Sequence, residues 1–137
     1  MFYGSLEGRP ISETRSDLTA LSEAWAAGRT NVAVGGDGES PDDLIARAHG
    51  ALWANGRAGT PCLLGRTEAG RHVAVIAHST FNKAVLAVAM GKGLGSMFGI
   101  PQDNACVNVI DFKVADGAVS VVATNITPDP SHAPSST

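Results

Sequence analysis

His72-Val-Ala-Val-Ile-Ala-His-Ser-Thr-Phe81 joins two apolar runs of the chain. The first run, residues 72–77, is rich in β-branched residues, which is typical of a central parallel strand covered on both faces. The second run, residues 81–90, is apolar almost all round and stops at Gly91, which predicts a buried helix. His78 therefore lies where a strand is expected to become a helix. Ligands of α/β sheets bind beyond the carboxyl ends of the strands, and a helix N-terminus attracts anions, so a phosphate group is the first ligand to consider.

The first half of the chain predicts two amphipathic helices. Apolar residues recur at intervals of three and four from Ser12 onward, which indicates a helix that ends at Gly28. Ser40-Pro-Asp-Asp43 has the features of a second helix start, with serine as the N-cap, proline at the first helical position and carboxylates near the positive end of the dipole. This helix is expected to run to about Asn55, and residues 56–70 to form a long connection.

The second half of the chain predicts a hairpin and a tail. A short helical turn is expected at residues 94–98. Hydrophobic and polar residues alternate over 105–112 and again over 119–123, with Asp116-Gly117 between them, which is typical of an antiparallel hairpin. Residues 127–137 are rich in Pro and Ser and are expected to be disordered. The alternating helices and strands predict one α/β domain over residues 1–126, with a mostly parallel sheet that ends in this hairpin.

The composition limits the classes of partner. The 137 residues are 44% hydrophobic and 17% charged, which fits one soluble globular domain. Ten basic and thirteen acidic residues leave a formal net charge of −3, so the chain lacks the basic face that nucleic acids or acidic membranes require. Residues 73–90 contain His78, Asn82 and Lys83 and are too polar to span a bilayer.

The N-terminus and the cysteines indicate an intracellular protein. The first residues lack a charged segment followed by an apolar one, so no secretory signal is predicted, and the compartment is expected to be the cytoplasm or a plastid. Cys62 and Cys106 lie far apart without a partner motif, which favours two free thiols over a disulfide or a metal pair. His49, His72 and His132 show no ligand spacing, so neither a metal site nor a cofactor is expected.

Four motifs occur in an order that resembles a known family. They are Gly4-Ser-Leu-Glu-Gly8, Gly38-Glu-Ser40, Val73-Ala-Val-Ile-Ala-His78 and Asp103-Asn-Ala-Cys-Val-Asn-Val109. Together they resemble the histidine phosphatase (phosphoglycerate mutase-like) superfamily over nearly the whole chain up to the tail. His78-Ser-Thr-Phe-Asn-Lys-Ala84 and Asn125-Ile-Thr-Pro128 look most like plant and cyanobacterial members similar to 2-carboxyarabinitol-1-phosphate phosphatase. The resemblance implies a three-layer α/β/α fold and action on small phosphorylated metabolites.

The resemblance also shows which family features are missing from the sequence. The family's first strand ends in an Arg-His-Gly motif, whose histidine becomes phosphorylated, and a second arginine clamps the phosphate. Neither is found here: Arg71-His72 lacks the glycine and precedes the apolar run. The family's proton donor would fall just upstream of Met1. The chain therefore looks like a member that lacks its N-terminal third, with a sheet that is incomplete at the N-terminus.

The resemblance assigns site roles residue by residue. His78 aligns with the family's second histidine, a catalytic residue that donates a hydrogen bond to the phosphoryl group, and the Ser79 N–H would bind the same group. Glu39 is a site-facing carboxylate or, as favoured for a loop residue before an N-cap, a structural one. Asn104 either forms hydrogen bonds with the loops of the site or stabilises a turn before the next strand. Arg47 is expected to pair with solvent or with a nearby carboxylate.

Several interpretations of function follow. In the first, the chain is the C-terminal portion of a phosphomonoesterase or mutase that is inactive alone, because catalytic groups that act as a unit fail together. In the second, it is a degenerate member that binds a phosphometabolite or a protein without catalysis; an ordinary α/β fragment without a ligand is a third. A missing first strand would leave an open edge beside residues 72–77, so we expect marginal stability, or a homo-oligomer or other partner that covers this edge.

Overall fold

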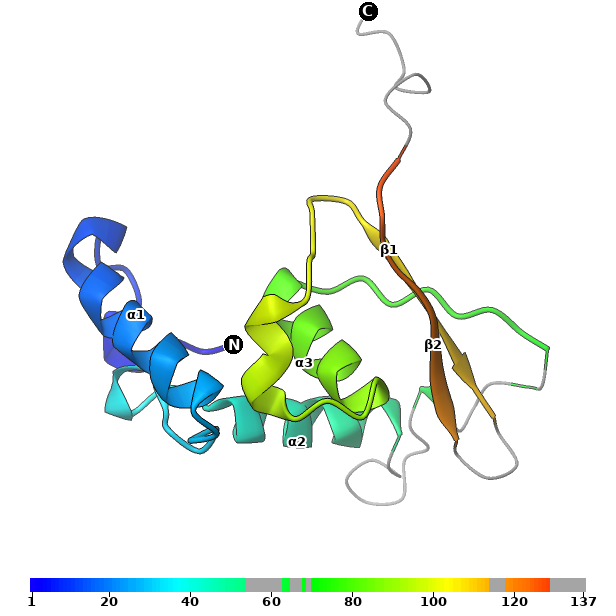
Figure 1. The fold of residues 1–137 in the computed structure, drawn as a ribbon, viewed down its shortest axis with the longest axis horizontal. Helices are drawn as coiled ribbons and strands as arrows, with labels where there is room; N and C mark the ends of the chain where they lie inside the picture. The colour runs from blue at the N-terminus through cyan, green and yellow to red at the C-terminus, as the bar shows by residue number, and fades with distance from the viewer. Residues whose placement is uncertain (54–62, 65–67, 69, 114–117, 129–137) are drawn as a thin grey trace, which may run out of the picture.

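The computed structural model describes residues 1–53, 63–64, 68, 70–113 and 118–128. Most of the regular secondary structure of the described chain is helical, and two strands form an antiparallel sheet near its C-terminal end (Figure 1). This mixture of helices and strands is consistent with the predicted α/β class. A parallel sheet is not seen among the described residues, and the three-layer arrangement stays a prediction.

The two N-terminal helices form as predicted. Helix α1 spans Ile11–Ala26, and the chain turns at Gly28 with a φ of 86°. Helix α2 spans Pro41–Leu52, and its expected end at Asn55 lies outside the described residues. Two short 3-10 helices precede them, η1 at Gly4–Leu6 before α1 and η2 at Val34–Gly36 before α2.

Helix α3 is the centre of the fold. It spans Ser79–Ala89, its middle residues 84–87 are buried, and the chain leaves it through Gly91, as expected from the sequence. The 3-10 helix η5, Leu94–Gly99, covers it where a helical turn was predicted. The main core lies where α1, α2, α3 and η5 meet, and its fully buried side chains include Val34, Leu44, Leu86 and Met97.

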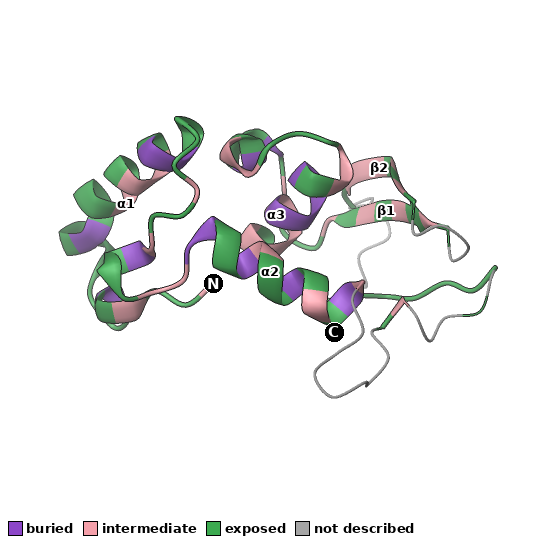
Figure 2. Cartoon of the chain, turned by 90° about the horizontal axis from the view of Figure 1, so that it is seen from below, coloured by how far each residue is buried: buried purple, intermediate pink, exposed green. Residues whose placement is uncertain are grey.

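The predicted hairpin is confirmed. Strand β1, Val107–Phe112, pairs antiparallel with β2, Val119–Ile126, in a ladder that includes Ile110↔Val121. Its inner face packs Ile110 and Val121 against the main core. The outer face carries Val107, Val109 and Val122, which are exposed. Figure 2 shows intermediate and exposed positions along both strands. The Asp116-Gly117 turn lies outside the described residues, as does most of the predicted tail.

The prediction of a buried strand at residues 72–77 is wrong. This segment belongs to no helix or strand, and it runs as a long trace toward α3 (Figure 1). All its residues are exposed, and Ile76 is 99% exposed. A strand requires a neighbour for its backbone N–H and C=O groups, and the described chain supplies none beside this segment. An apolar segment suited to a sheet interior is thus left in solvent.

Candidate functional site

His78 is the N-cap residue of α3. Its backbone is extended, with φ −80° and ψ 155°, and its carbonyl oxygen accepts the Asn82 N–H at 3.0 Å, which closes the first turn. Its imidazole is exposed and has no hydrogen-bond partner within the described part of the chain. The prediction that a helix begins after His78 is therefore confirmed, while the predicted strand before His78 is not formed.

Ser79 begins α3 and is also exposed. No side chain caps this helix start, and no acidic residue lies in the first turn. The first N–H groups of a helix have no partner within the helix. At α3 these groups and the positive end of the dipole are consequently left to solvent or to a ligand.

The start of α2 is built in the opposite way. The Ser40 hydroxyl accepts the Asp43 N–H at 3.1 Å, and the Asp43 carboxylate accepts the Ser40 N–H at 3.0 Å, which makes a capping box. Hydrogen bonds from the Ser40 side chain and then from its backbone lower the pKa of Asp43. Helix α2 thus satisfies its own N-terminus, whereas α3 does not.

Glu39 ties the N-terminus to α2. Its carboxylate accepts Arg47 Nε–H at 2.8 Å and Nη2–H at 3.0 Å, and it also accepts the Phe2 N–H at 3.1 Å. The Met1 ammonium lies 3.7 Å away. These partners occupy both carboxylate oxygens, so the geometry fits the structural role. The expected pairing of Arg47 with a nearby carboxylate is confirmed.

The same contacts set the charge of this pair. Hydrogen bonds from Arg47 lower the pKa of Glu39, assisted by the Phe2 N–H and by the charges of Arg47 and the N-terminus, and burial opposes them. Hydrogen bonding to Glu39 raises the pKa of Arg47 in turn. Both groups are therefore held in their charged forms.

The motifs 4–8 and 38–40 form one interlocked unit. The Ser5 N–H donates to Asp37 Oδ1 at 2.8 Å, and the Glu39 N–H donates to the Phe2 carbonyl oxygen at 2.8 Å. Gly4 has a φ of 56°, and a Cβ atom there would collide with Asp37 Oδ1 and the Gly38 backbone. A Cβ atom at Gly38 would likewise collide with the Phe2 carbonyl oxygen and the Gly4 nitrogen. Gly4 and Gly38 therefore allow residues 2–5 and 37–39 to approach within hydrogen-bond distance.

Asn104 is exposed in a turn, and the contacts of this region belong to its neighbours. The Asp103 N–H donates to Asn125 Oδ1 at 2.7 Å, and Asn125 Nδ2 donates to Asp103 Oδ2 at 2.9 Å. Asn108 joins them by accepting the Asn125 N–H at 3.0 Å. This cluster links the motifs 103–109 and 125–128. Asn125 has a positive φ of 55°, a conformation that asparagine adopts more readily than most residues.

A small cavity lies beside the start of α3. It has a volume of about 130 Å³, and Thr80, Met1 and Tyr3 line it together with Leu18, Ser22, Trp25 and Phe98. Because the Met1 ammonium also pairs with Glu39, the N-terminal segment reaches both Glu39 and the α3 start. Among the described residues, no hydrogen bond joins Asn104 or the cluster of Asp103, Asn108 and Asn125 to this region.

The described residues also bear on metal binding, membrane insertion and thiol chemistry. It contains no group of three or more His, Cys, Asp or Glu residues placed to hold a metal ion. No described helix is long and apolar enough to cross a membrane. Cys106 is a free thiol, 3.6 Å from Gln102 Oε1, and Cys62 lies outside the described residues.

Comparisons with known proteins identify the family. The model of the histidine phosphatase superfamily (branch 1) matches residues 1–127. The chain belongs to the histidine phosphatase superfamily. This assignment agrees with the four motifs. The structure joins the first motif to Asp37, next to the second, and the fourth motif to Asn125 by hydrogen bonds.

A curated relative is similar to the chain over about two thirds of its length. A probable 2-carboxy-D-arabinitol-1-phosphatase of Arabidopsis thaliana is 34% identical over 91 residues, which are 64% of this chain and 18% of the relative. The chain thus spans less than a fifth of that protein's length. No solved structure matches the chain.

Proposed function

We propose that the N-terminal end of α3 binds the phosphoryl group of a small phosphate monoester. The uncapped, acid-free start of this helix, beside the exposed His78, is the observation that carries the proposal. Free N–H groups and the positive end of a helix dipole together favour an anion. The capped and acidic start of α2 would repel the same group, so the two helix starts have different roles.

His78 and Ser79 divide the work of binding in this proposal. The imidazole of His78 donates a hydrogen bond to one phosphoryl oxygen, and the Ser79 N–H donates to another. Family membership supports these roles, because the resemblance of residues 73–78 to the superfamily aligns His78 with its second histidine. The name of the Arabidopsis relative makes 2-carboxy-D-arabinitol 1-phosphate a natural first substrate to test.

Hydrolysis requires more groups than this helix start offers. Transfer through a phosphohistidine needs a nucleophilic imidazole in line with the leaving oxygen, cations on the phosphoryl oxygens, and an acid for the leaving alkoxide. We assign His78 to phosphate binding and none of the described residues to these other roles. The 137 residues alone are therefore proposed to bind phosphate esters without turning them over.

A degenerate, non-catalytic member is the second candidate. The exposed imidazole of His78, which has no cap hydrogen bond, fits this candidate, because a degenerate member would still bind phosphate although it catalyses no reaction. The two candidates differ in one respect. A catalytic portion gains phosphatase activity when a family segment that bears the Arg-His-Gly motif is supplied, and a degenerate member does not.

Binding of glycerol 3-phosphate tests the site. Ser79 occupies the first position of α3, where proline is tolerated, so Ser79→Pro removes one N–H donor and leaves the helix intact. We expect Ser79→Pro and His78→Ala each to weaken binding about tenfold, as for a hydrogen bond to a charged group. His49→Ala, another exposed histidine near the far end of α2, is the matched control and should change nothing.

Two outcomes of this titration decide the matter. Equal affinity in the wild-type chain and both α3 variants would remove the helix start from the proposed site. Release of inorganic phosphate by the chain alone, at a rate that His78→Ala abolishes, would overturn the claim that it is inactive.

The exposed segment at residues 72–77 supports a proposal about partners. Val73, Val75 and Ile76 are exposed here, and Val107 and Val122 are exposed on the outer face of the hairpin. Solvent-facing sides of antiparallel sheets are normally polar, and unpaired apolar strands attract other strands. We infer that a strand from outside the described chain, either another copy or a complementary segment, pairs with residues 72–77.

A further inference from the structure

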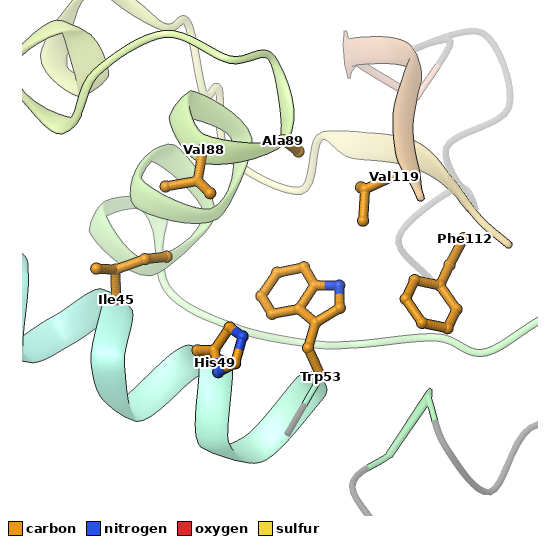
Figure 3. Close-up of a pocket in the computed structure, with 7 residues that line it drawn as sticks. All are labelled: Ile45, His49, Trp53, Val88, Ala89, Phe112 and Val119. Atoms are coloured by element: carbon orange, nitrogen blue, oxygen red, sulfur yellow. The ribbon is translucent and has the colours of Figure 1, made fainter. Parts of the chain in front are cut away.

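An apolar cavity opens at the end of α3 opposite to His78. It has a volume of about 440 Å³, within the range of small-molecule sites, and it lies between the last turns of α2 and α3 and the hairpin (Figure 3). Trp53, Phe112 and Val119 line its inner part, while Val88 and His49 lie at its exposed rim. Helix α3 has eleven residues, so ~15 Å separate this cavity from the proposed phosphate site. We name it the indole cavity.

Trp53 brings an unused hydrogen-bond donor to the indole cavity. Its Nε1 atom is buried and has no hydrogen-bond partner in the part of the chain that the structure describes, which is uncommon for a buried indole nitrogen. Figure 3 shows the indole ring inside the cavity, with its nitrogen on the side of Val119 and Phe112. In contrast, Trp25 Nε1 donates to the Val32 carbonyl oxygen at 2.8 Å. An acceptor that a ligand brings against Trp53 Nε1 would satisfy this donor.

The other lining groups define the rest of this ligand. The His49 and Trp53 rings are stacked, with centroids 6.1 Å apart, and the remaining described lining residues are apolar. Such walls suit a flat aromatic molecule. Both α2 and α3 end at this cavity, so the negative ends of their dipoles face it and disfavour an anion. A neutral acceptor, such as a carbonyl oxygen, satisfies the indole N–H without this penalty.

We propose that the indole cavity binds a neutral, planar aromatic molecule that carries one carbonyl-type acceptor, and that Trp53 Nε1 donates to this acceptor. The site is independent of the phosphate-binding function proposed for α3. Its ligand differs from a phosphate ester in both charge and polarity. The recognition element is one hydrogen bond from the buried indole nitrogen, beside largely apolar walls.

The two tryptophans provide a test within one spectrum. In the ¹⁵N-labelled chain, 2-acetylnaphthalene should shift the indole N–H signal of Trp53 in a saturable manner, and leave that of Trp25, which already has a partner, unchanged. The matched probe 2-isopropenylnaphthalene replaces the carbonyl oxygen by a CH₂ group. It should bind about tenfold more weakly, as expected for the loss of one hydrogen bond. The anion 2-naphthoate should also bind more weakly than the ketone.

Variants then locate the site. Val119→Phe should fill the cavity and abolish binding, while Val122→Phe, on the outer face of the same strand, should leave it unchanged. Trp53→Phe retains an aromatic ring but removes the donor, so the ketone and the alkene should bind this variant equally. Equal affinities of both probes for the wild-type chain, parallel shifts of both indole signals, or no saturable shift would each overturn the proposal.

Discussion

Arg47 binds Glu39 through two hydrogen bonds, from Nε to Oε1 at 2.8 Å and from Nη2 to Oε2 at 3.0 Å. The pair joins the middle of α2 to the loop before it, and through the Phe2 N–H it holds the N-terminal segment as well. Glu39 is 13% exposed and Arg47 is 56% exposed at the side chain, so solvent screens one partner more than the other. We expect this arrangement to contribute about 1 kcal/mol to folding.

Glu39→Gln should destabilise the chain in a pH-dependent way. The pKa of Glu39 is lowered in the folded state, so its contribution is complete above the unfolded-state pKa of about 4.3 and is lost as the pH falls through the folded-state value. Urea unfolding at pH 7 should show a loss of about 1 kcal/mol that shrinks toward pH 3. Glu23→Gln, at an exposed position of α1, should show no such difference. A loss for Glu39→Gln that stays constant across this range would contradict the ion-pair explanation.

Ser40→Ala should remove the capping box of α2. The Ser40 hydroxyl accepts the Asp43 N–H, and its loss leaves that donor without a partner at the helix start. Substitution of such an N-cap typically costs about 1 kcal/mol. The midpoint of urea unfolding measures the effect. Ser16→Ala, at an exposed position inside α1, should have little effect; a similar loss in both variants would assign the effect to something other than capping.

Gly4→Ala and Gly8→Ala form a matched pair. Both glycines have positive φ values, 56° and 75°, so each substitution carries the left-handed backbone penalty of about 1 kcal/mol. At Gly4 the new Cβ also collides with Asp37 and the Gly38 backbone, whereas nothing lies within 4 Å at Gly8. Gly4→Ala should therefore cost about 1–3 kcal/mol more than Gly8→Ala. Equal thermal unfolding midpoints would show that the two segments separate easily.

Ile76→Lys should reduce self-association of the chain. Ile76 is 99% exposed within an uncharged apolar segment, and a lysine on such an edge discourages pairing with another strand. Light scattering after size-exclusion chromatography should show larger species for the wild-type chain than for this variant. Ile11→Lys removes an equally apolar residue that is 68% exposed on α1, and it should behave as the wild type does. A wild-type chain that is monomeric and melts cooperatively would argue against pairing of residues 72–77 with another copy.

Local chemistry accounts for the helices and the hairpin. The Ser40-Pro41 start of α2 and the Gly91 exit of α3 were predictable because caps and left-handed glycines act over only a few residues. The hairpin was predictable from its alternation over 105–112 and 119–123. His78 could likewise be placed at a helix start, since the change from one apolar run to the next occurs there.

Contacts between distant segments explain what the chain alone could not reveal. Whether Glu39 faces a ligand depends on Phe2 and Arg47, 37 and 8 residues away, and its carboxylate proves to be engaged by both. The lack of a partner for Trp53 Nε1 could not be predicted from the sequence, because it depends on how α2, α3 and the hairpin pack around the indole ring. Its i,i+4 spacing from His49 was the one local signal.

Residues 72–77 show most clearly what the local sequence determines and what only the tertiary structure determines. Their β-branched, apolar composition already determines that they suit the interior of a sheet, because side-chain preferences are local properties. A strand, however, exists only when a second strand meets its N–H and C=O groups, and that is a property of tertiary structure. The described chain brings no such neighbour, so the same residues lie extended and exposed before His78. The family could thus be predicted from the sequence, whereas the lack of a strand at residues 72–77 and the cavity at the far end of α3 required the fold.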